Sequence, residues 1–297
     1  MDTKKDCLDR LRGPWGFHMT LLWCNAGVQS RMLSKILKCH VLRPSKLTQG
    51  SASRISPGSL STWSRIARSR EFMEPYKLSN LQRAFLVPYF GIKAIMDPSR
   101  GDYVAGFGDV LMSKSGLQEL KMKMKQTTEG TRILKEKPLI TEESLDMERL
   151  RSLPEDTLGH NYAKFMDKHG FNADERSKVK YMMDPDLAYV MVRYRQVHDF
   201  WHVLCDVPIS VLGEIGLKWF EWRAMGMIVP SAALSGLIGP LRLNSQDRRL
   251  LRDVYFPWAI ASGGSCRELL GYDYVANMDK TLEEVRIDLG IVPFRPE

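Results

Sequence analysis

Apolar residues recur every three or four positions along most of the chain from about residue 74 onward, which predicts a helical protein. Alternating strand patterns are nearly absent from this part, and no segment repeats another. Proline and glycine separate the helical runs, so their ends can be predicted as well. The predicted helices span residues 80–97, 117–125, 157–168, 186–206, 208–226, 247–262 and 282–289. We therefore predict an all-α, single-domain helical bundle over residues 71–297.

The N-terminal segment has a different composition from the rest of the chain. Residues 10–70 contain eleven Lys or Arg and no Asp or Glu, so their charge exceeds the chain's formal net charge of +8. A composition rich in Arg and Ser and poor in acids is typical of a mitochondrial transit peptide. We predict that residues 1–70 are such a peptide or a disordered N-terminus. Because the body is then close to neutral, no nucleic-acid partner is expected.

The five cysteines argue against a disulfide framework. They stand at positions 7, 24, 39, 205 and 266, and no pair has the C-x-x-C spacing. This excludes a cysteine-based zinc knuckle and favours a reducing compartment.

The stretch HDFWHVLCDVPISVLGE, residues 198–214, carries the candidate chemistry. On a helical wheel, His198, Asp199 and His202 share one arc at the edge of an apolar stripe. The short connection around Pro208 predicts two adjacent antiparallel helices, which would bring Glu214 to the level of His202. Two imidazoles with one or two carboxylates suit Zn²⁺, and also Fe²⁺ or Mn²⁺.

The same residues have ordinary structural interpretations. His198 and His202 can be interfacial histidines with satisfied hydrogen bonds, and Asp199 can be a solvated charge. Glu214 can pair with Lys218 four residues later on the same helix. Residue types and spacing alone leave the metal site and these alternatives open.

The motif H-D-x-x-H-x(11)-E from His198 to Glu214 resembles the signature of the coenzyme Q biosynthesis protein 4 family. The resemblance extends over about residues 74–297 and includes the stretches 158–166, 193–197 and 226–241. It implies an all-helical protein in which His198, Asp199, His202 and Glu214 bind the metal, expected to be Zn²⁺, with Fe²⁺ or another divalent ion left open.

The resemblance also implies a reaction and a location. The reaction would be C1 decarboxylation, with its oxidative nature left open, of 4-hydroxy-3-methoxy-5-polyprenylbenzoate to 2-methoxy-6-polyprenylphenol. That activity makes the chain a carbon–carbon lyase, in which Asp199 or Glu214 could move a proton. The protein would lie peripherally on the matrix side of the mitochondrial inner membrane, within a complex of ubiquinone-biosynthesis enzymes. A homo-oligomer is left open.

Two features suggest where a prenylated lipid could bind. Residues 225–241 are uncharged, but Pro230 and Pro240 interrupt them, which argues against a straight membrane span. We predict that this segment is a hairpin that either faces lipid or is buried in the core. Aromatic side chains just before this segment, and several methionines, could line a prenyl groove or belong to the core. These residues are Trp219, Phe220, Trp222, Met182, Met183 and Met191.

Two other functions compete with the lyase. One is a non-catalytic lipid-binding scaffold that organises the biosynthetic complex around a structural metal. The other, which is less favoured, is a metal-dependent hydrolase in which Asp199 acts on water.

Overall fold

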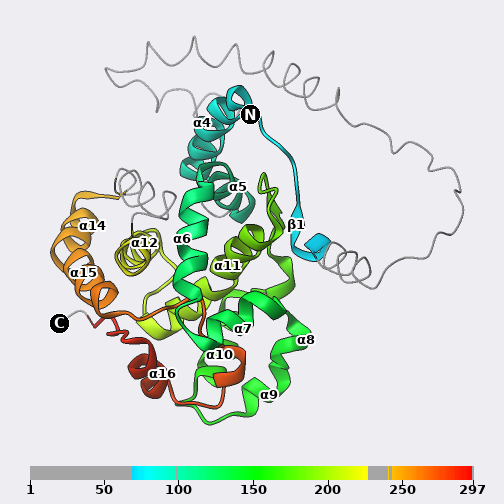
Figure 1. Cartoon of the computed structure of the whole chain (residues 1–297). Coiled ribbons are helices and arrows are strands. Elements are labelled where there is room, and N and C mark those ends of the chain that lie inside the picture. The colour runs from blue at the N-terminus through cyan, green and yellow to red at the C-terminus, as the bar shows by residue number, and fades with distance from the viewer. Residues whose placement is uncertain (1–68, 98–99, 227–239, 241–242, 296–297) are drawn as a thin grey trace, which may run out of the picture. The chain divides into compact units, whose positions relative to one another are not determined.

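The computed structural model describes residues 69–97, 100–226, 240 and 243–295 (Figure 1). Residues 1–68 of the predicted transit peptide, and most of the uncharged segment 225–241, therefore lie outside the described residues. Among the helices that the structure describes, none is both long enough and apolar enough to cross a membrane.

The described residues are mostly helical, as the sequence predicts. The longer helices are α4 (Asn80–Met96), α5 (Gly101–Leu111), α6 (Lys114–Met124), α7 (Thr128–Glu136), α10 (Leu158–His169), α11 (Pro185–Cys205), α12 (Val211–Met225), α15 (Phe256–Ser265) and α16 (Leu282–Leu289). Shorter helical elements are α8 (Glu142–Leu145), α9 (Met147–Ser152), η2 (Ala173–Glu175), α14 (Ser245–Leu250), the π-helical turn η4 (Leu251–Tyr255) and η5 (Val275–Asn277). A two-residue parallel pairing joins β1 (Met73–Glu74) to β2 (Val179–Lys180), too short to produce an alternating pattern.

Helix α11 forms the centre of the core (Figure 1). Its start is well specified, since Pro185 occupies the first turn and the Asp184 side chain accepts hydrogen bonds from the amides of Asp186 and Leu187. It ends at Asp206, whose φ of 55° is left-handed. Most of its 21 residues are buried, including the whole predicted apolar stripe. The helix packs against α6, α7, α10 and α16, so it is enclosed on several sides rather than along one stripe.

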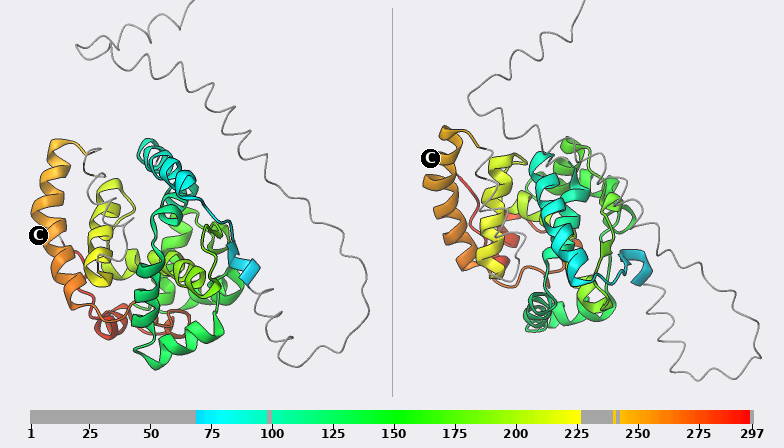
Figure 2. Two further views of the ribbon diagram at one scale, coloured as in Figure 1. Left: turned by 45° about the horizontal axis from the view of Figure 1, so that its top comes forward. Right: turned by 90° about the horizontal axis from the view of Figure 1, so that it is seen from above.

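A second layer is formed by α12 with α14, η4 and α15 (Figure 2). Close approach depends on Gly216, where an added Cβ would lie 2.3 Å from the ring of Tyr255. The absence of a side chain at Gly216 therefore allows α12 to pack closely against η4. The side chain of Phe220 is fully buried in this layer and stacks on Trp258, with 5.8 Å between ring centroids.

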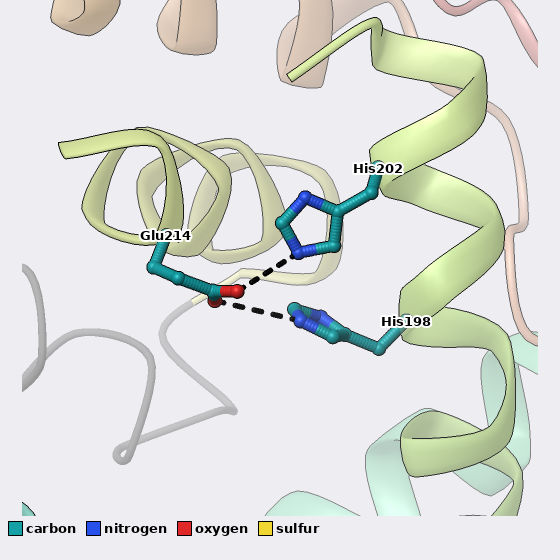
Figure 3. A group of neighbouring side chains, drawn as sticks. All are labelled: His198, His202 and Glu214. Carbon is teal, nitrogen blue, oxygen red and sulfur yellow. Dashed lines mark ion pairs between the residues drawn. The ribbon is translucent and has the colours of Figure 1, made fainter. Parts of the chain in front are cut away.

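The connection between α11 and α12 differs from the prediction. Helix α12 begins at Val211 with Ser210 as its N-cap, rather than at residue 208 as predicted. The predicted antiparallel arrangement is wrong, because the two helices cross steeply (Figures 1 and 3). The physical reason is the left-handed Asp206 followed by Pro208, which turns the chain sharply before the next helix starts.

Candidate metal centre

Two helices bring three potential ligands together (Figure 3). His198 and His202 are four residues apart on α11, so their side chains lie one above the other on the same face. Glu214 comes from the first turn of α12, which the Ser210 side chain fixes by accepting a hydrogen bond from the Gly213 amide. The ligand atoms of the three residues all lie within 4.8 Å of one another.

The Glu214 carboxylate faces both imidazole rings. Its Oε2 lies 3.6 Å from His198 Nε2, and its Oε1 lies 3.0 Å from His202 Nε2. Four ligands around a zinc ion at its usual bond length would be roughly 3.4 Å apart, so small side-chain rotations suffice to close the triad on an ion. The His202 side chain is 1% exposed and that of Glu214 is 37% exposed. One side of the triad is therefore open.

Hydrogen bonds on the far side of each ring fix which nitrogen faces Glu214. His202 Nδ1 lies 2.9 Å from the carbonyl oxygen of Val207, and His198 Nδ1 lies 2.7 Å from Glu221 Oε1. These two partners are acceptors, so each Nδ1 carries the proton and donates. Lys218 Nζ, a donor, also lies 3.3 Å from His198 Nδ1, but the contact with Glu221 is the shorter one. The Nε2 atoms are left to face Glu214, which is the usual state of metal-binding histidines.

His202 Nε2 shows that the residues fit a cation. This atom is buried, and it has no hydrogen-bond partner despite its proximity to Glu214. A buried ring nitrogen facing a carboxylate requires a proton or a cation between the two groups. The donor set, two imidazole nitrogens and a carboxylate, suits zinc or iron.

A buried charge network supports His198 from behind. The Glu221 side chain is 0% exposed and accepts hydrogen bonds from His198, from Lys218 Nζ at 2.9 and 3.0 Å, and from the Tyr194 hydroxyl. Burial alone would raise the pKa of Glu221, but the Lys218 and His198 charges and the hydrogen bonds lower it to about 2. The carboxylate is therefore ionised at neutral pH.

Without a metal, a proton on His198 balances the negative charge of the neighbouring carboxylates. Burial and Lys218 disfavour a charged His198, but Glu221 and Glu214 outweigh them and raise its pKa to about 9. The pKa of Glu214, although raised by burial, falls well below its usual range because of the two histidines. A positive charge is thus required beside Glu214, and a divalent ion can supply it when the histidine proton leaves.

Asp199 does not join the triad. Its carboxylate is paired with the Arg176 guanidinium, which also donates to the Ala173 carbonyl at 3.2 Å. Asp199 is the next residue to His198 on α11, but its side chain leaves the helix in another direction. Of the four residues expected as ligands, the structure brings His198, His202 and Glu214 together and places Asp199 beside them.

Sequence reasoning missed Glu221 and Tyr194, and it gave Lys218 a different partner, Glu214. Lys218 and Glu221 follow Glu214 by four and seven residues, so the helical period places all three on one face of α12. This spacing of charges along a largely apolar helix was the available signal. Tyr194 precedes His198 by four residues on α11. No local pattern pointed to Arg176.

Helix α10 packs aromatic side chains against α11. Tyr162 stacks on Phe200 with 4.0 Å between ring centroids, and Phe165 stacks on His202 at 5.7 Å. These contacts hold the helix that carries both histidines, so segment 158–166 supports the site without supplying a ligand.

Comparisons with known proteins agree on one family. A family model described as Coenzyme Q (ubiquinone) biosynthesis protein Coq4 matches residues 72–295. The mitochondrial ubiquinone biosynthesis protein COQ4 of Lachancea thermotolerans is 40% identical, over 77% of this chain and 70% of that protein. The corresponding protein of Schizosaccharomyces japonicus is 41% identical, over 70% of this chain and 87% of its own length.

A solved structure shares the fold. The crystal structure of a candidate ubiquinone biosynthesis protein from Nostoc punctiforme has a TM-score of 0.54 and 24% identity, and the match covers 70% of this chain and 97% of that one. At this identity the likeness supports the fold alone.

Proposed function

The chain belongs to the family of the Coenzyme Q (ubiquinone) biosynthesis protein Coq4 and acts in ubiquinone biosynthesis, and from that membership we propose its reaction. It removes the C1 carboxylate of 4-hydroxy-3-methoxy-5-polyprenylbenzoate and yields 2-methoxy-6-polyprenylphenol. In the simplest form the bond from C1 to the carboxylate carbon breaks, CO₂ leaves and a proton takes its place on C1. An oxidative form would place oxygen on C1 and would require an oxidant such as dioxygen.

The observation that carries this proposal is a three-residue ligand set that is open on one side. Structural zinc sites are closed by four protein ligands, whereas catalytic sites keep one position free. Here His198, His202 and Glu214 converge, and the Glu214 side chain remains 37% exposed. A bound Zn²⁺, or Fe²⁺ in an oxidative reaction, would supply a Lewis acid that grips an anionic oxygen of the substrate.

The chain's own residues have separate roles in this proposal. Glu221 orients His198 and keeps its proton on Nδ1, while Val207 does the same for His202. Glu214 is a ligand and can move a proton at its carboxylate. Asp199 remains a second candidate for proton transfer, although it would first have to leave Arg176.

We further propose the location and partners of the protein. Its relatives are named as mitochondrial proteins, and residues 1–70 would act as the transit peptide. The prenyl tail of the substrate requires access to lipid. A peripheral position on the matrix side of the inner membrane, in a complex with other ubiquinone-biosynthesis enzymes, meets that requirement.

The second candidate function is a lipid-binding scaffold without catalysis. One observation favours it: a cavity of about 320 Å³ has Arg176, Arg195 and Gln196 in its lining, which does not include the triad. A metal in the triad would then be structural.

Elemental analysis and a decarboxylation assay test the two functions together. The full chain, Glu214→Gln and the exposed control Glu283→Gln are analysed for bound metal and for CO₂ release from a short-prenyl 4-hydroxy-3-methoxybenzoate. We expect one metal per chain and CO₂ release, both lost only in Glu214→Gln. Metal without CO₂ release, even with mitochondrial extract added, would favour the scaffold. Metal absent from the parent would refute the site.

A further inference from the structure

The outer face of α4 is apolar. Its large exposed side chains are Leu81, Phe85, Tyr89, Ile92 and Met96, with 68, 65, 42, 58 and 65% of their surface accessible. At 100° per residue these five positions fall within an arc of about 80°. The remaining exposed positions between Leu81 and Met96 are Ala84 and Pro88, which are also uncharged. An ordinary surface helix presents a polar face to water, whereas the outward face of α4 between Leu81 and Met96 is apolar.

Contacts with α5 fix this orientation. The aromatic ring of Phe90 occupies the space above Gly106, and the ring of Phe107 occupies the space above Gly91. The Arg83 guanidinium donates to the Val110 carbonyl of α5. The pair α4–α5 lies at the edge of the described residues (Figures 1 and 2). The helix is therefore held from behind and cannot turn its apolar face inward.

The charged residues of the segment 75–96 are all basic. They are Lys77, Arg83 and Lys93, while the nearest acids in the sequence, Glu74 and Asp97, stand directly outside the segment. Arg83 is engaged with α5, while Lys93 lies at the border of the apolar arc and Lys77 is exposed in the segment just before the helix. An apolar face bordered by basic groups is complementary to a lipid surface that carries negative charge.

We propose that α4 lies in the plane of an anionic membrane surface, with its outer face inserted among the lipids. With 17 residues the helix is about 25 Å long, which is shorter than the hydrocarbon core of a bilayer, so it lies on the membrane and does not span it. The inference deepens the peripheral location proposed above by naming the surface, and it rests on that proposal only for the identity of the membrane.

The size of the face favours lipid over a second copy of the chain. The five side chains expose roughly 600 Å² together, which is at the upper end of the range for the largest apolar patch of a monomer, and such patches are often functional. A standard dimer interface needs about 800 Å² from each partner, including a polar rim. The face is therefore large enough to be a binding surface but small for a stable dimer, which favours lipid.

Vesicle flotation of the full chain tests the proposal. The double variant Phe85→Glu/Ile92→Glu places charges in the apolar arc, and Ile287→Glu on α16, where Ile287 is 64% exposed, is the matched control. Vesicles contain phosphatidylcholine with or without phosphatidylglycerol, at low and high salt. High salt weakens attachment through the basic residues before position 70, which parent and variants share.

We expect the double variant to partition into phosphatidylglycerol vesicles at least about tenfold less than the parent, with Ile287→Glu unchanged. Lys77→Gln/Lys93→Gln should show a smaller preference for phosphatidylglycerol over phosphatidylcholine than the parent at low salt, since the basic residues before position 70 remain in both. Hydrogen exchange on the parent should slow in residues 80–96 when vesicles are added. Each variant is also analysed for metal, so that loss of membrane binding with retained metal leaves the catalytic proposal intact.

Two outcomes would overturn the inference. One is a double variant that floats like the parent at high salt. The other is slow exchange in residues 80–96 before vesicles are added, together with a dimer in sedimentation that the double variant abolishes. That pair of results would assign the face to a second copy of the chain.

Discussion

Replacing Glu221 with glutamine tests whether the buried carboxylate behind His198 controls metal binding. Glu221 touches none of the three candidate ligands except His198, through the 2.7 Å contact with Nδ1. Glutamine has nearly the same shape and keeps one acceptor oxygen for Nδ1. The substitution therefore removes the charge while leaving the ring in place.

The expected size follows from these contacts. Loss of a partner behind a metal-binding histidine typically lowers metal affinity by about 10- to 100-fold. Since glutamine keeps a neutral acceptor, we expect the lower end, about tenfold or ~1.4 kcal/mol. The substitution would also leave the buried Lys218 ammonium without its carboxylate partner. Removal of one member of a buried ion pair typically costs about 3–5 kcal/mol of folding stability.

Two measurements separate affinity from stability. Metal affinity is measured by competition with a chromophoric chelator, and stability by urea unfolding of the metal-free protein. Tyr194→Phe is the matched control, because it removes a hydrogen bond to the same carboxylate and leaves the contact with His198 intact. It should lose about 1.5–3 kcal/mol of stability, the value of a hydrogen bond to a charged group, with metal affinity within about threefold of the parent.

The reasoning fails in two cases. If Glu221→Gln binds metal as tightly as the parent, the carboxylate does not act through His198. If Tyr194→Phe loses as much affinity as Glu221→Gln, the effect follows general loosening of the core and not the charge on Glu221.

Three further outcomes are expected. Asp199→Asn should keep one metal per chain in elemental analysis, and loss of the metal would restore Asp199 as a fourth ligand. Because the pKa of His198 is raised from 6.5 to about 9, its stabilisation of the metal-free protein is complete below about pH 6.5 and is lost as the pH rises through 9. Urea unfolding at several pH values should show this decline, and a flat profile would contradict it. Gly216→Ala should lower stability by about 1–3 kcal/mol through contact with Tyr255, whereas Gly101→Ala, which meets open space, should leave the melting temperature unchanged or slightly higher.

Helices were predictable where caps and periodicity agreed. At α11 the pair Asp184-Pro185 and the apolar spacing indicate the same start, and at α10 the left-handed Gly170 ends the helix as expected. Helix α5 was missed because Gly101, Gly106 and Gly108 weaken the helical signal. In the folded protein Gly106 allows contact with α4, so its advantage is tertiary and leaves no local pattern.

The candidate site was predictable only within each helix. The spacing of His198 and His202 places them on one face of α11 whatever the surroundings are. The direction in which α12 leaves the turn depends on the left-handed backbone of Asp206, which no pattern in the sequence indicates. Asp199 pairs with Arg176. Arg176 lies in an irregular segment, and the path of such a segment cannot be predicted from the spacing of apolar residues.

Helix α4 shows why a correctly predicted helix can still be assigned the wrong surroundings. The recurrence of apolar residues identifies Asn80–Met96 as helical, and the same recurrence would normally assign those residues to the core. In the structure the glycine contacts with α5 occupy the opposite side of the helix, so the apolar stripe that defines the period points outward. Periodicity shows that one face of a helix is more apolar than the other. It does not show whether that face contacts protein, water or lipid. For a protein proposed to act on a prenylated substrate, an outward apolar face beside Lys93 is what an enzyme needs to reach a substrate held in a lipid layer.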